Sequence, residues 1–96
     1  MAGQQYIGTG RLGVAQNVSY TGTAGVITNG VTTGVTKVRV LVTTDAFVTT
    51  DGSTPSATAG AYVPALSPEY LTVTPGQIVK AVQVAAAGTL YVVEII

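Results

Sequence analysis

A chain of 96 residues, 47% of them hydrophobic and 8% charged, is long enough for one domain with a single core. Its four basic and four acidic residues cancel, so it lacks the net positive charge that a nucleic-acid-binding domain needs. The chain has no Cys and no His, which excludes a disulfide framework and leaves Ser–His or Cys–His catalysis without its base.

The first third of the chain is predicted to be the loosest part, because it holds eight of the twelve glycines and one charged residue, Arg11. Each glycine that becomes ordered loses more backbone entropy than any other residue. We therefore expect residues 1–13 to form an extended arm that orders only by docking on a partner, and the alternative is a disordered tail with no role. Its apolar anchors would be Tyr6, Ile7 and Leu12, and Arg11 could pair with a partner carboxylate. Residues 14–96 would form the folded domain.

Two elements are expected in the next stretch. Residues 12–20 can form a strand, although apolar and polar residues alternate only roughly there. In residues 25–35, β-forming residues flank Asn29-Gly30. Asn-Gly between such residues is the strongest short hairpin signal, so this segment is predicted to be a hairpin.

The clearest strand lies in residues 36–50, which we interpret as the central strand and its continuation. Val38, Val40 and Val42 alternate with Lys37, Arg39 and Thr43, and strict period two with β-branched residues is typical of a half-buried strand. This strand should separate the dry side of a sheet from its wet side.

Turn residues divide the remainder into short strands. Asp51-Gly52-Ser53 should break the chain, and Pro75-Gly76 fits the central positions of a type II turn. Strands are expected at residues 61–65, 69–74, 77–86 and 89–96, and no segment has helical periodicity. Seven or eight short strands predict an all-β fold, a small β-sandwich or jelly-roll-like domain. Its predicted core residues are Val38, Val40, Val42, Leu71, Val73, Val82, Val84, Leu90 and Val92.

The chemistry-bearing motifs are weak. Gly8, Gly10 and Gly13 match the dinucleotide-binding spacing, but the strand before and the helix after that this motif requires are not predicted. The four acids could in principle supply a carboxylate pair for glycoside hydrolysis. Asp51 is better explained by its turn and Glu94 by an exposed position on the last strand, so we predict no enzyme activity, no cofactor and no metal site.

From Thr36 onward the chain resembles small structural proteins of tailed bacteriophages that decorate or cement the icosahedral head. Four fragments carry the likeness. They are Val38-Arg39-Val40 with Asp45-Ala46-Phe47-Val48, Pro68-Glu69-Tyr70-Leu71-Thr72-Val73, Pro75-Gly76-Gln77, and Ala86-Ala87-Gly88-Thr89-Leu90-Tyr91-Val92-Val93-Glu94.

The resemblance implies a compact β-sandwich, often a trimer, that ties neighbouring capsid subunits together without catalysis. Its partner would be the major capsid protein and its location the capsid surface of a virion, after synthesis in the host cytoplasm. No signal peptide or membrane-spanning run is recognisable in the sequence. The low charge and the apolar end Ile95-Ile96 independently favour a homo-oligomer, and a trimer is the assembly we expect. The predicted partner-binding residues are Tyr6, Ile7, Arg11, Leu12, Ile95 and Ile96.

Two other functions remain open at this point. A receptor- or carbohydrate-binding module of a head fibre or tail would gather Tyr62, Tyr70 and Tyr91 at an exposed loop end as stacking surfaces. A small hydrolase would instead show a cleft that holds two of the four acids.

Overall fold

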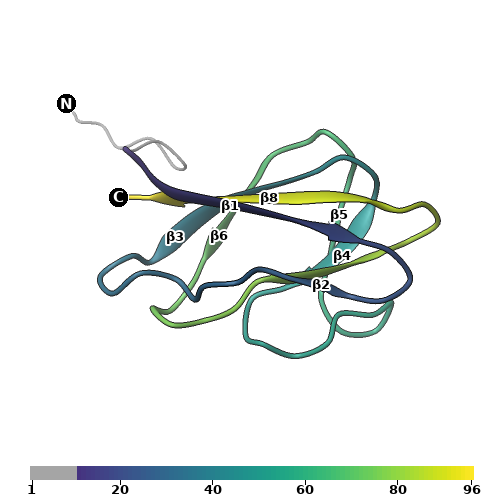
Figure 1. Cartoon of the computed structure of the whole chain (residues 1–96), viewed down its shortest axis with the longest axis horizontal. Helices are drawn as coiled ribbons and strands as arrows, with labels where there is room; N and C mark the ends of the chain where they lie inside the picture. The colour runs from purple at the N-terminus through teal and green to yellow at the C-terminus, as the bar shows by residue number, and fades with distance from the viewer. Residues whose placement is uncertain (1–10) are drawn as a thin grey trace.

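The computed structural model describes residues 11–96, which fold into eight strands and contain no helix (Figure 1). The all-β sandwich predicted from the sequence is therefore confirmed. The strands are β1 (Leu12–Tyr20), β2 (Gly25–Val26), β3 (Lys37–Val42), β4 (Ala46–Thr49), β5 (Ala61–Val63), β6 (Glu69–Thr72), β7 (Lys80–Gln83) and β8 (Gly88–Ile95).

The strands form two four-stranded antiparallel sheets, sheet A in the order β1-β8-β3-β6 and sheet B in the order β2-β7-β4-β5. Each strand of the first half pairs with its counterpart in the second half: β1 with β8, β2 with β7, β3 with β6 and β4 with β5. The additional pairs β3–β8 and β4–β7 roll this long nested hairpin into two layers. The connectivity is that of a jelly roll.

Nesting places the two described ends of the chain together and puts the β4–β5 connection at the tip of the hairpin (Figure 1). It also divides residues 36–50, because β3 lies in sheet A and its continuation, β4, lies in sheet B.

The core lies between the sheets and consists mainly of small aliphatic side chains. Val38, Val40 and Val42 of β3 are completely buried, as their alternation predicts, and they alternate with partly exposed residues along the strand. Tyr20 is the largest buried side chain, and its hydroxyl reaches the backbone and side chain of Thr44. The predicted core residues Val73, Leu90 and Val92 are also buried, and Leu71 packs against the core from its rim.

The prediction that Val82 and Val84 of residues 77–86 face the core is wrong. Val84 is 41% exposed and Val82 is only partly buried, whereas Val79 and Ala81 are completely buried. Lys80 lies between those two buried residues, and its charged head belongs on the solvent side of the sheet. Because side chains alternate along a strand, a shift of one residue exchanges the two faces.

The predicted hairpin at Asn29-Gly30 is also wrong. The residues on either side of it bond to the segment before β7: Ile27 N–H donates to Val79 O at 3.2 Å, and Val31 N–H donates to Gln77 O at 2.9 Å. Neither Asn29 nor Gly30 has the positive φ that a type I′ turn requires. Glycine is needed at position 30 because the backbone of Gly76 packs against it, and a Cβ on residue 30 would lie 2.6 Å from Gly76 O.

The turn at Pro75-Gly76 is confirmed as predicted. Gly76 has a φ of 89°, and Gln77 N–H donates to Thr74 O at 3.1 Å, which closes the turn. Positive φ at the third residue is the mark of type II geometry, and glycine adopts it without a steric penalty. This turn supports the backbone of Gly30.

Candidate interaction surface

The two described ends of the chain meet at one corner of sheet A, which we call the terminal corner and define as Arg11, Leu12, Ile95 and Ile96. Arg11 N–H donates to Ile96 O at 2.9 Å, and Ile96 N–H donates to Arg11 O at 2.7 Å. Leu12 pairs with Ile95 in the β1–β8 ladder. Four of the six predicted partner-binding residues are thus brought together; Tyr6 and Ile7 lie outside the described residues.

The terminal corner presents apolar side chains to solvent. Leu12 is 71% exposed and Ile96 is 61% exposed, while Ile95, the cross-strand partner of Leu12, is buried. The cause is topological, because β1 opens and β8 closes the nested hairpin, so apolar residues from both ends must lie side by side. The β1 strand begins at Leu12, so the last residues assigned to the arm belong to the sheet.

A buried carboxylate lies on the inner side of this corner. Glu94 is 3% exposed, which corrects the exposed position predicted for it. Its Oε2 accepts hydrogen bonds from Thr32 N–H at 2.8 Å and Thr32 Oγ1–H at 2.9 Å. These bonds offset part of the cost of burying a charge and tie the β2–β3 connection to β8. The signal in the sequence is the period-two series Leu90, Val92, Glu94, which places Glu94 on the inward face.

The outer face of sheet A, beside the terminal corner, carries the two basic residues of β3, Lys37 and Arg39, and Lys37 pairs with Ile95 across the sheet. Cross-strand pairing places Arg39 between Tyr70 of β6 and Val93 of β8, and it places Leu41 next to Tyr91. Tyr70 and Tyr91 are 43% and 42% exposed. They lie on β6 and β8, which β3 separates, so the two rings do not adjoin.

The third predicted stacking residue lies on the other sheet. Tyr62 of β5 is 52% exposed and packs edge-on against Phe47, with ring centroids 5.6 Å apart. The three tyrosines are therefore exposed but separated, and each lies on a strand. The cluster at a loop end that a carbohydrate-binding module would show is absent from this part of the chain.

Asp45 connects this ring to a neighbouring loop. Tyr62 Oη–H donates to Asp45 Oδ2 at 2.5 Å, and Ala65 N–H donates to Oδ1 at 2.7 Å. The bond from Tyr62 and then that from Ala65 hold the pKa of the Asp45 carboxyl below its usual value. The same contact raises the pKa of the Tyr62 hydroxyl, because the phenol is favoured as a donor to the carboxylate.

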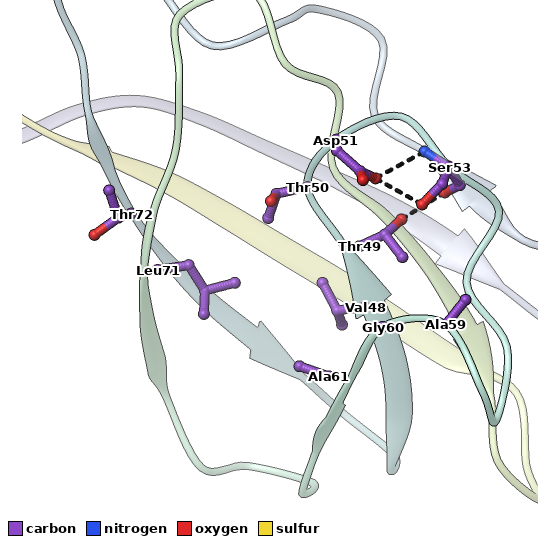
Figure 2. Close-up of a pocket in the computed structure, with 10 residues that line it drawn as sticks. All are labelled: Val48, Thr49, Thr50, Asp51, Ser53, Ala59, Gly60, Ala61, Leu71 and Thr72. Carbon is purple, nitrogen blue, oxygen red and sulfur yellow. Dashed lines mark hydrogen bonds between the residues drawn. The ribbon is translucent and has the colours of Figure 1, made fainter.

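Two of the surface clefts contain one acid each. The larger, of about 450 Å³, lies between the tip of the nested hairpin and β6, with Val48, Ala61 and Leu71 in its wall (Figure 2). Its only carboxylate, Asp51, accepts hydrogen bonds from Ser53 N–H at 3.0 Å and Ser53 Oγ–H at 2.6 Å (Figure 2). The smaller cleft, of about 290 Å³, contains Asp45. Neither cleft brings together the two carboxylates that a small glycoside hydrolase would need.

Residues 11–96 contain no group of three acidic side chains placed to hold a metal ion. Within the same residues no helix is long and apolar enough to cross a membrane. In comparisons with known proteins, no family model, no curated protein and no solved structure matches the chain.

Proposed function

We propose that this protein is a non-enzymatic structural component of a tailed-phage virion, which decorates and cements the head by binding the lattice of the major capsid protein. The observation that carries the proposal is the terminal corner. Leu12 and Ile96 are among the most exposed large hydrophobic residues of the domain, and they come from opposite ends of the described chain. Burying each against a partner would contribute roughly 1.5 to 3 kcal/mol.

The surface around this corner suits a permanent contact with another protein. Zero net charge and 8% charged residues leave little electrostatic repulsion to keep copies or partners apart. Thr, Ser, Gly and aliphatic residues make up most of the chain, and a surface of such residues binds mainly through shape and apolar contact. Such a surface fits a lattice whose subunits are held in place, where ordering costs are low.

The fold adds support by analogy. Jelly rolls occur in viral capsid proteins, in lectins and in cupins, so the topology alone does not select among these functions. The separated tyrosines and the clefts without aromatic residues give the carbohydrate-binding alternative less support. The proposed location is the capsid surface, after synthesis in the host cytoplasm, and the proposed assembly is a homo-oligomer.

The proposal is tested by electron microscopy of particles from a culture that carries the gene, with gold-labelled antibody against the folded domain. We expect regular labelling of icosahedral heads. A second preparation should carry Leu12→Ser and Ile96→Ser together, and we expect at least tenfold less protein on the heads. The control, Leu66→Ser, removes an exposed leucine outside the terminal corner and should decorate normally.

Label on tails alone, or on no particle, would refute the proposed function. Full decoration by the double variant would show that the capsid contact lies away from the terminal corner. Circular dichroism of each variant establishes that the domain is folded before the comparison is made.

A further inference from the structure

A sandwich of two open sheets has four edge strands, and three of those formed by residues 11–96 are protected against pairing. The β2 strand has two residues, and β5 has three and is followed by Pro64. The β6 strand has four residues, begins with Glu69 and follows Pro68. Short length, proline and charge are the usual means by which proteins prevent edge-to-edge association.

The fourth edge, β1, has none of these protections along most of its length. It has nine residues, with no charge and no proline, and it pairs only with β8 among the described strands. A register irregularity affects its first residues, between Leu12 and Ala15, but from Ala15 to Tyr20 every residue has a partner in β8. Most of this run is therefore a regularly paired, uncharged edge.

The direction of the β8 hydrogen bonds identifies the β1 backbone groups that point away from the sheet. Thr43 N–H donates to Thr89 O at 3.1 Å, so Thr89 bonds toward β3. In an antiparallel ladder the direction alternates, so Leu90 and Val92 bond toward β1. Their partners on β1 are Val18 and Gln16.

The N–H and C=O groups of Ala15, Asn17 and Ser19 consequently face outward, along the edge of β1 that no other described strand pairs with. Gly25 packs so closely on the Ser19 carbonyl oxygen that a Cβ there would overlap it, so this end of the edge is covered. Ala15 and Asn17 are both exposed. Their two donors and two acceptors form the open part of the edge.

We propose that β1 is a self-association edge, at which two copies of this chain pair antiparallel about a two-fold axis to join their A sheets into one continuous sheet. The register that uses all the open groups places Ala15 opposite Asn17 of the second copy. The axis then passes beside Gln16, and the two copies exchange four backbone hydrogen bonds. Val14, which is 49% exposed, lies opposite Val18 of the second copy.

The length of the β1 edge favours the β1 strand of a second copy of this chain as its pairing partner. Among the described strands, only β8 approaches the length of β1, and β8 is already paired on both sides. The edges of β2, β5 and β6 are too short to cover it. Two β1 edges match each other in length and are both uncharged, so one symmetric contact satisfies both. The pairing does not depend on capsid binding, so its failure would leave the proposed binding to the capsid lattice untouched. A monomeric chain would contradict only the homo-oligomer proposed with it.

Amide hydrogen exchange of the full chain, followed by NMR at several protein concentrations, tests the pairing directly. We expect the Ala15 and Asn17 amides to exchange at least tenfold more slowly at high concentration than at low concentration. The Gln16 and Val18 amides, which bond to β8, should show no such dependence. Protection of Ala15 and Asn17 that is independent of concentration would overturn the proposal, because the edge would then be covered within one chain.

Sedimentation velocity of an edge variant provides the second test. Asn17→Pro removes an N–H that makes no bond within the described chain, and proline is tolerated at such a position on an edge strand. We expect the wild type to be dimeric or a higher even-numbered assembly, and the dissociation constant of the variant to rise at least a hundredfold. Asn17→Lys, which places a charge on the edge, should act in the same direction if the proline variant does not fold.

Thr58→Lys is the matched control, because it adds the same charge at an exposed position on the tip loop and should associate like the wild type. A wild type that stays monomeric at several hundred micromolar would overturn the proposal. An assembly that survives both Asn17 variants, including a trimer, would also overturn it, because the contact would then lie on another surface.

Discussion

At the scale of single residues, Asp45 shows how an exposed carboxylate can organise a loop. Its two oxygens accept from Tyr62 and from the backbone of Ala65, so it ties the start of β4 to the connection that follows β5. Both bonds are made to the charged form, which is why the pKa of Asp45 is lowered. The contribution to stability is therefore present above the unfolded-state pKa, about 3.9, and is lost as the pH falls through the lower folded-state value.

Replacing Tyr62 with Phe tests this account. The substitution removes the hydroxyl that contributes most to the shift, so the pKa of Asp45 should rise toward its usual value. Titration of the side-chain carboxyl ¹³C shifts by NMR measures the change. Asp51 is an internal control, because its pKa is lowered by Ser53 and should stay the same in both proteins. An unchanged Asp45 titration in Tyr62→Phe would show that the backbone bond from Ala65 sets the shift.

At the scale of elements, the one charged residue of β7 decides which of its side chains face the core and which face solvent. Lys80 pairs across the ladder with Thr49 and Val26, and its two buried neighbours, Val79 and Ala81, face the core. The size of the apolar residues alone would favour turning Val82 and Val84 toward the core, because both are larger than Ala81. The free energy of burying a lysine charge outweighs the difference of a few methyl groups.

Two valine truncations in this segment should therefore differ in cost. Val79→Ala removes two methyl groups from a completely buried site and should lower the free energy of unfolding by about 2 kcal/mol, cavity included. Val82→Ala, on the outer face, should cost well under about 1 kcal/mol. Urea denaturation gives both values. Equal costs, or a larger cost at Val82, would mean that the faces of β7 are exchanged.

At the scale of the whole molecule, the nested hairpin makes every strand of one half depend on a strand of the other half. The backbones of Arg11 and Ile96 are bonded to each other, while the tip of the hairpin is an exposed loop after Asp51. The chain should therefore still fold when its two ends are joined and new ends are made in the exposed tip loop.

A circular permutant tests that arrangement. Joining Ile96 to Met1 makes residues 1–10 the connecting loop, and opening the chain between Ser53 and Thr54 leaves the strand pairs intact. We expect the same far-ultraviolet circular dichroism and a free energy of unfolding within about 2 kcal/mol of the natural order, because loop closure depends weakly on loop length. Opening between Val40 and Leu41 is the control and should prevent folding, because it cuts β3, which pairs with strands on both sides.

The same molecule-wide pairing explains which parts of the candidate surface could be predicted. Leu12 and Ile96 could be predicted as partner-binding residues from the sequence, because large apolar side chains near the ends of a chain favour burial against a partner. Their gathering at one corner does not follow, since it depends on β1 pairing with β8. The partner-binding role of Tyr6 and Ile7, which lie outside the described residues, stays a prediction.

The sequence by itself determined the features that depend on a few neighbouring residues: the all-β class, the two faces of β3 and the type II turn at Pro75-Gly76. Period-two burial and the φ preferences of Pro and Gly are local properties, so they can be read from short segments. Only the tertiary structure decided the partners of each strand. Asn29-Gly30 favours a local hairpin, yet its flanks pair with the segment before β7, and Thr32 bonds to Glu94 across 62 residues. Pairing over such separations is decided by how much surface the whole sandwich buries, and no short segment contains that information.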